Sequence, residues 1–96
     1  MPDWYLYIVR CRDGTLYTGI STDVNRRLAE HRGGGNAASK YLKGRAPITL
    51  MLQRRLGSRN LALKVERRVK MLSREKKEQM IRDPGCIEGI VTRASE

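Results

Sequence analysis

Arg27 and His31 are the first two side chains in this sequence whose chemistry and spacing fit a reaction at a phosphate group. They are four residues apart, so on a helix they lie on one face. An arginine binds phosphate oxygens with its forked guanidinium, and a histidine exchanges a proton with water. Taken singly, either is more often an ordinary surface group, so the interpretation depends on their neighbours.

Those neighbours are expected from a hairpin that carries Tyr5, Tyr7 and Tyr17. Residues 4–12 are aromatic and β-branched, as in strands, Asp13-Gly14 is a turn signal, and residues 15–20 form the partner strand. Phenolic hydroxyls beside a cation and an imidazole make a site that could activate water against a phosphate. Tyrosines that share one face of a hairpin are also explained by packing alone.

The loop length decides which hairpin residues share a face. A two-residue loop would pair Arg12 with Thr15 and put the apolar residues of the two strands on opposite faces. A three-residue loop, with Gly14 in the left-handed conformation, pairs Cys11 with Thr15 and gives one apolar and one tyrosine face. The apolar face consists of Leu6, Ile8, Leu16 and Ile20. The tyrosine face consists of Tyr5, Tyr7, Tyr17 and Gly19. A core needs a coherent apolar face, so we favour the three-residue loop.

Arg27 and His31 belong to a helix that we expect to begin after Ser21-Thr22-Asp23, which supplies N-cap residues. It runs to about His31 or Arg32, where Gly33-Gly34-Gly35 ends it. Val24 and Leu28 are its apolar pair, and Arg27 and His31 are expected on a face away from them.

Glu66 is the candidate metal ligand. It flanks the apolar stripe of a predicted helix and is surrounded by basic residues, so it should stay ionised at neutral pH. Magnesium takes one or two carboxylates and keeps several waters. Lys70, four residues on, makes an ion pair an equally good explanation.

The remaining segments complete one α+β domain over residues 4–82. Residues 36–42 form a possible short helix. Residues 47–56 predict a third strand with Ile48, Leu50 and Leu52 on one face. Ser58 caps a helix of about 15 residues with an apolar stripe, Ser73 caps a helix over 74–82, and 83–96 are expected to be a loose tail. The expected fold is a small, three-stranded, mostly antiparallel sheet flanked by helices, in the order β-β-α-(α)-β-α-α.

The charge indicates the partner. Twenty Lys and Arg against ten Asp and Glu give a net charge of +10 in 96 residues. Residues 43–77 hold twelve basic and two acidic side chains, which alone account for that excess. Such a field attracts phosphate backbones. The alternatives are a solvated basic surface without a dedicated ligand or, less favoured, a membrane surface, for which the segment lacks a broad aromatic-rich apolar face.

The location expected from the sequence is the cytoplasm. No apolar run is long enough to span a bilayer, and the N-terminus does not resemble a signal peptide. Cys11 and Cys86 are then expected to be free thiols, and two cysteines with one histidine are too few for a structural zinc site.

The motifs together resemble those of the GIY-YIG nucleases. Tyr5-Leu6-Tyr7 and Tyr17-Thr18-Gly19 are similar to the two name-giving motifs, with Tyr5-Leu6 where the first has Gly-Ile. The likeness continues through Ser21-x-Asp23-x-x-Arg26-Arg27-Leu28-x-x-His31 and ends at Ala62-x-x-x-Glu66-x-x-x-Lys70-x-Leu72, over residues 4 to 81. The closest likeness is to the small single-domain bacterial members.

The resemblance implies metal-dependent cleavage of nucleic acid. Glu66 would hold one Mg²⁺ or Mn²⁺, and Tyr17 would activate the water with Tyr7 in support. Arg27 would neutralise the phosphate, and His31 would orient or assist proton transfer. Without a DNA-recognition domain, we expect low sequence specificity.

Three functions are compatible with these features. We favour an endonuclease or exonuclease on DNA, more than RNA, that acts as a monomer or weak dimer without a membrane partner. A non-catalytic nucleic-acid-binding module on the same fold is the alternative. A protein-interaction domain with incidental charge would explain the basic segment but not the constellation. The side chains expected to contact nucleic acid are Arg26, Lys40, Lys43, Arg45, Arg67, Lys70 and Lys77.

Overall fold

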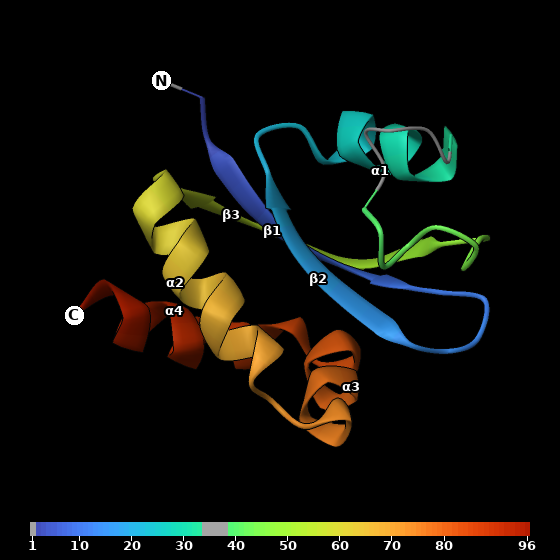
Figure 1. Cartoon of the computed structure of the whole chain (residues 1–96). Coiled ribbons are helices and arrows are strands. Elements are labelled where there is room, and N and C mark those ends of the chain that lie inside the picture. The colour runs from blue at the N-terminus through green and yellow to red at the C-terminus, as the bar shows by residue number, and fades with distance from the viewer. Residues whose placement is uncertain (1, 34–38) are drawn as a thin grey trace.

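The computed structural model describes residues 2–33 and 39–96. Within these ranges the elements are β1 (Trp4–Arg10), β2 (Leu16–Ser21), α1 (Val24–Gly33), β3 (Thr49–Gly57), α2 (Arg59–Lys70), α3 (Arg74–Arg82), the 3-10 helix η1 (Pro84–Cys86) and α4 (Ile87–Ser95). The three strands form an antiparallel sheet in the order β2-β1-β3 (Figure 1). The expected α+β fold is confirmed.

The possible short helix over 36–42 lies partly outside the described residues. Residues 40–44 form turns, and β3 follows at Thr49.

Helices cover both faces of the sheet, so the central strand β1 is buried on both sides. On one face, Leu6 and Ile8 pack with Val65 and Val69 of α2 and with apolar side chains of α3 and α4. On the other face, Tyr7 and Val9 pack with Val24 and Leu28 of α1 and with Leu42 and Ile48. Figure 1 shows α1 apart from the other helices, across the sheet. The tyrosine face is thus a second core rather than a solvated surface.

The hairpin has the predicted three-residue loop. The backbone N–H of Cys11 donates to the carbonyl of Thr15 at 2.8 Å, and Val9 pairs with Tyr17. Gly14 has a φ of 86°, the left-handed conformation that this loop needs. The predicted faces are confirmed: Leu16 and Ile20 pack beside Leu6 and Ile8, and Tyr5 and Tyr17 beside Tyr7.

The predicted single-faced alternation of the third strand is wrong. Ile8 pairs with Leu52 and the next residue, Val9, pairs with Leu50, so β3 holds an extra residue between these pairs. Such a bulge reverses the side-chain alternation. Ile48 and Leu50 therefore face the core beneath α1, whereas Leu52 faces the core beneath α2.

The expectation of a loose tail over 83–96 is also wrong. Asp83 caps η1 by accepting from the backbone N–H of Gly85, and α4 follows directly. Ile87 is 1% exposed and Ala94 is 3% exposed, both in the core with Val65 and Val69. The apolar pattern of this segment is too weak to predict a helix, because only one short side of α4 is buried.

The caps of the central helices were predicted correctly. Ser58 accepts from the backbone N–H of Leu61 at the start of α2, and Ser73 accepts from that of Lys76 at the start of α3. No helix within the described residues is both long and apolar enough to cross a membrane.

Candidate active site

Tyr7 is the centre of the candidate site and is 1% exposed. It pairs with Gly19 across β1 and β2, and its ring lies over that glycine. A Cβ atom at position 19 would be 2.5 Å from Oη of Tyr7 and 2.6 Å from its Cζ. Real Cβ atoms do not approach so closely, so Gly19 is required for the phenol of Tyr7 to reach the β2 edge of the sheet.

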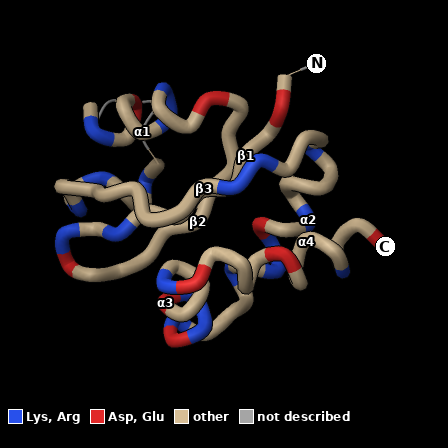
Figure 2. Tube along the Cα trace, turned by 180° about the vertical axis from the view of Figure 1, so that it is seen from behind, with Lys and Arg blue, Asp and Glu red and all other residues tan. Residues whose placement is uncertain are grey.

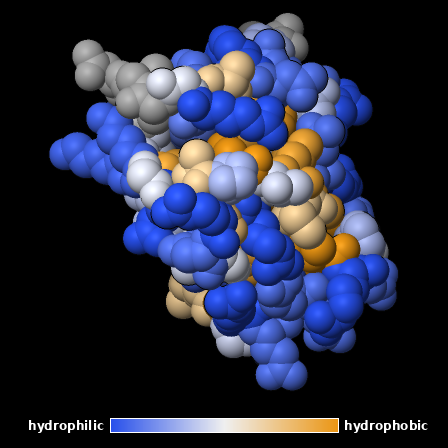
Figure 3. Space-filling view, turned by 90° about the vertical axis from the view of Figure 1, so that its right-hand side faces the viewer, coloured by the Kyte–Doolittle hydropathy of each residue, from blue (hydrophilic) through white to orange (hydrophobic). Residues whose placement is uncertain are grey.

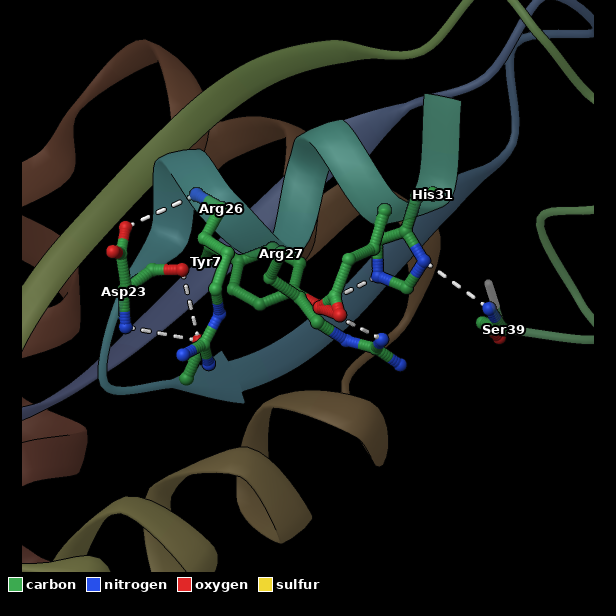
Figure 4. Close-up of polar contacts among 8 residues, drawn as sticks. Tyr7, Asp23, Arg26, Arg27, His31 and Ser39 are labelled. Carbon is green, nitrogen blue, oxygen red and sulfur yellow. Dashed lines mark hydrogen bonds and ion pairs between the residues drawn. The ribbon is translucent and has the colours of Figure 1, made fainter. Parts of the chain in front are cut away.

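His31 lies against that phenol. Nε2 of His31 is 3.1 Å from Oη of Tyr7, and Nδ1 accepts a hydrogen bond from the backbone N–H of Ser39 at 3.1 Å. Because Nδ1 accepts, the proton of the neutral ring is on Nε2, which donates to Tyr7. Figure 4 shows Tyr7 and Ser39 on opposite sides of the imidazole.

The structure corrects the predicted face of His31. It is 4% exposed and lies on the buried side of α1 with Val24 and Leu28, not away from them. His31 is three residues after Leu28, a spacing that places it on the same side of a helix. Burial lowers the pKa of His31, the charge of Arg27 lowers it further, and Glu30 opposes this shift.

Tyr7 holds its proton at neutral pH. Burial raises the pKa of Tyr7 to about 12, the neighbouring Tyr17 and Glu66 act in the same direction, and Arg27 acts in the opposite direction. The ring centroids of Tyr7 and Tyr17 are 6.5 Å apart, and those of Tyr17 and His31 are 6.0 Å apart. Tyr17 is half-buried, whereas Tyr7 is buried.

Arg27 extends from α1 beside this cluster, with 29% of its side chain exposed. Its Nη1 is 3.5 Å from Oε1 of Glu30, one turn along the helix. Asp23 accepts from the backbone N–H of Arg26 at 3.0 Å, and this cap sets where the helix begins (Figure 4). The predicted group of Tyr7, Tyr17, Arg27 and His31 is therefore brought together.

Glu66 approaches the group from α2, on the other side of the sheet. Its side chain is 18% exposed, and Oε2 is 3.4 Å from Nζ of Lys70, so the ion pair considered from the sequence exists. Glu66 is also close enough to Tyr7 to raise the pKa of its phenol. Within residues 2–33 and 39–96, no three His, Cys, Asp or Glu side chains gather as a metal cage. One carboxylate fits an ion of the magnesium type, which otherwise keeps waters and substrate phosphate.

The predicted nucleic-acid contacts are placed on several elements. Arg26 is exposed on α1, Lys40 and Lys43 are exposed in the turns before β3, and Arg67 and Lys70 are exposed on α2. Figure 2 shows basic positions on α1, around the hairpin turn and along α3. Lys77 is half-buried on α3, the helix whose Arg74 donates to the carbonyl of Gly14 in the hairpin loop.

Part of the positive charge is neutralised locally. Arg45 pairs with Asp13 at 2.6 Å, Arg54 with Glu88 at 2.8 Å and Arg55 with Asp3 at 2.8 Å. The basic segment 43–77 is also divided among turns, β3, α2 and α3 rather than gathered on one side. Hydrophilic side chains dominate the face in Figure 3, around a band of apolar groups.

Two residues of the cluster were missed from the sequence. Tyr41 stacks on Tyr17 with ring centroids 5.5 Å apart, and Ser39 orients His31 through its backbone. The signal for Tyr41 was an aromatic residue between Lys40 and Lys43 in a segment without an apolar pattern. No sequence signal marks the contact of Ser39, because a backbone N–H is present at nearly every residue.

Comparison with known proteins gives a family match over most of the chain. The model of the GIY-YIG catalytic domain matches residues 3–79. The UPF0213 protein of Cronobacter sakazakii is 47% identical over 81 residues, which cover 84% of this chain and 83% of that protein. A UPF0213 protein of Pectobacterium carotovorum is 49% identical over 82 residues, which cover 85% of this chain and 81% of that protein.

Solved structures agree with the fold. The solution NMR structure of a UPF0213 protein from Bacillus halodurans is 43% identical, with a TM-score of 0.53 over 82% of each chain. That of a protein from E. faecalis is 34% identical, with a TM-score of 0.61 over 85% of each chain.

Proposed function

Since this chain belongs to the GIY-YIG family, a nuclease superfamily, we propose that it hydrolyses phosphodiester bonds of DNA with one divalent metal ion and low sequence specificity. The observation that supports this most is the convergence of Tyr7, Tyr17 and His31 with Arg27 beside them and Glu66 opposite. The cluster supplies a proton-transfer group and a phosphate-binding cation, and Glu66 supplies a carboxylate on α2.

The two tyrosines take different roles. Tyr7 is buried and protonated, and its oxygen accepts from His31, so it positions the imidazole and holds a proton rather than removing one. Tyr17 is half-buried beside both rings and is therefore more accessible than Tyr7, so it is the group that takes the proton of the attacking water. Arg27 neutralises charge that builds on the scissile phosphate.

Glu66 would hold the metal, Mg²⁺ or Mn²⁺, and exchange its ion pair with Lys70 for that contact. When bound, the ion would polarise the phosphate. Lys70 and Arg67 on α2 and Arg26 on α1 are exposed and would contact backbone phosphates, which carry no sequence information. The single site per chain leads to cutting of one strand per event, by a monomer or weak dimer.

The test is cleavage of labelled single-stranded, duplex and branched DNA with Mg²⁺ or Mn²⁺. Wild type is compared with Glu66→Gln and with Glu75→Gln, a matched change at an exposed glutamate of α3. Metal-dependent cleavage that is lost only in Glu66→Gln supports the proposal. Equal cleavage by all three proteins, or by none, contradicts it.

A non-catalytic nucleic-acid-binding module is the second candidate, favoured by the ion pair that Glu66 makes with Lys70. It predicts salt-sensitive binding without cleavage, with an affinity for DNA that falls steeply between roughly 50 and 200 mM salt. In that case Glu66→Gln binds DNA at least as well as wild type, because it removes a negative charge from a basic surface.

A further inference from the structure

A column of flat groups extends from the candidate active site to the surface. The ring of Tyr41 stacks on that of Tyr17 at an interplanar angle of 27°. The guanidinium carbon of Arg45 lies 4.4 Å from the centroid of Tyr41. Tyr41 is 41% exposed, and one of only two large apolar side chains exposed within the described residues. The column therefore joins a residue of the site, Tyr17, to a solvent-accessible aromatic ring.

Contacts around the turn hold this column in place. Nε of Arg45 donates to the carbonyl of Tyr41 at 2.7 Å, and Nη1 donates to Oδ2 of Asp13 at 2.6 Å. The carbonyl of Arg45 also accepts from the backbone N–H of Arg12 at 3.0 Å, which ties the turn to the hairpin. Leu42, 2% exposed, anchors the same turn in the core. Since Leu42 supplies the anchor, burial does not account for an aromatic residue at position 41.

We propose that Tyr41 and Arg45 form a stacking subsite for an unpaired DNA base next to the scissile phosphate, which makes single-stranded DNA the substrate class. The proposal rests on the proposed nuclease function and specifies its substrate. A base stacks on the solvent side of the column, because aromatic rings and guanidinium planes both accept the face of a base. A base inside a duplex is stacked on both faces and cannot reach the subsite.

The basic residues next to Tyr41 suit a DNA strand that passes over the column. Lys40 and Lys43 flank Tyr41 in the sequence and are exposed, so they can contact the phosphates on either side of the stacked base. Tyr17 belongs both to the column and to the cluster with His31, at 6.0 Å between ring centroids. The column thus links a base stacked at its solvent side to the cluster that contains Tyr17. Stacking is tolerant of sequence, in agreement with low specificity.

The experiment measures binding without divalent metal, so that cleavage plays no part. Fluorescence anisotropy compares single-stranded and duplex DNA on wild type, Tyr41→Ala, Tyr41→Phe and Arg45→Lys. Met71→Ala is the control for loss of an exposed apolar side chain elsewhere, since Met71 is 81% exposed. We expect Tyr41→Ala to weaken single-strand binding by about 5- to 100-fold and duplex binding little, with Tyr41→Phe near wild type. Arg45→Lys keeps the positive charge but removes the planar guanidinium, so we expect this variant to bind single-stranded DNA more weakly as well.

A second measurement needs no variant. Single-stranded DNA that contains 5-iodouracil is bound to the wild-type protein and crosslinked by ultraviolet light. The crosslinked residue is then identified by mass spectrometry. Attachment at Tyr41 supports the subsite. Attachment only at other residues, or equal loss of single-strand and duplex binding in Tyr41→Ala, overturns it.

The two proposals fail separately. A protein whose single-strand binding depends on Tyr41 but that never cuts with Mg²⁺ or Mn²⁺ retains the subsite and loses the nuclease function. A protein that cuts in a Glu66-dependent manner, but binds and cuts single strands equally well after Tyr41→Ala, retains the function and loses the subsite.

Discussion

Tyr7 accepts a hydrogen bond from His31, with 3.1 Å between Oη and Nε2, and both side chains are buried. The direction follows from the other ring nitrogen, which accepts from the backbone N–H of Ser39. A buried imidazole and a buried phenol thus satisfy each other at the β2 side of the sheet. Each is held in one orientation before any substrate arrives.

Replacement of Tyr7 by phenylalanine keeps the ring in the core but removes the acceptor of the His31 N–H. We expect the free energy of unfolding to fall by about 1–3 kcal/mol, because a buried donor loses its partner. DNA cleavage should fall by about 100-fold or more, as expected when a group of the proton-transfer site is lost. Urea unfolding and single-turnover cleavage measure the two effects. Tyr5→Phe, the same change at a neighbouring half-buried tyrosine, is the control, and equal effects of both would contradict the role of Tyr7.

The single histidine gives the stability of this protein a distinct pH dependence. Because burial lowers the folded-state pKa of His31, its neutral form stabilises the fold fully above the unfolded pKa of about 6.5. That stabilisation is lost as the pH falls through the lower folded-state pKa. Between pH 7 and pH 5, the urea midpoint of wild type should therefore fall more steeply than that of His31→Gln. Parallel slopes would mean that His31 is not held neutral.

Ion pairs that contain a carboxylate affect stability in a separate, lower range of pH. The Arg10 guanidinium, 2.8 Å from Oε2 of Glu78, lowers the pKa of that carboxyl, so this pair loses its contribution only near and below a pH of about 4.5. The slope between pH 7 and pH 5 is therefore specific to His31 rather than to these carboxylates.

Gly19→Ala should displace Tyr7, since the added Cβ would lie 2.5 Å from its Oη. We expect a loss of about 1–3 kcal/mol in the free energy of unfolding from overpacking, and a shift in the NMR signals of the His31 ring. Gly33→Ala is the matched control, because a Cβ at the end of α1 meets nothing within 4 Å among the described residues. A Gly19→Ala protein with wild-type stability and unchanged His31 signals would show that the ring of Tyr7 adjusts freely.

Ile87→Ala tests whether the C-terminal helix belongs to the core. Ile87 is 1% exposed and packs with Val65 and Val69, so its truncation should cost about 2–5 kcal/mol in the free energy of unfolding. Thr92→Ala, at an exposed position of the same helix, should change stability by less than about 0.5 kcal/mol. Chemical denaturation followed by circular dichroism distinguishes them. Equal, small effects would restore the expectation of a loose tail.

Local rules were enough to predict much of the framework. The hairpin loop follows from Gly14 and from the need for one apolar face, and the helix starts follow from Asp23, Ser58 and Ser73. Each of these depends on residues close together in sequence. Strand periodicity also placed Tyr7 and Tyr17 on one face of the hairpin, whereas the face of His31 on its helix was not predicted correctly.

The remaining features depend on contacts between segments that are far apart in the chain. The bulge in β3 sends Leu50 and Leu52 to different cores, and α4 is ordered because Ile87 fills space beneath α2. The same holds for the site, where His31 is buried by the second core and oriented by Ser39, and Tyr41 is brought onto Tyr17. The sequence by itself determined the fold class and the chemical groups of the site. The tertiary structure decided which of those groups are buried, protonated or stacked, because burial and long-range packing arise only when the separate elements come together.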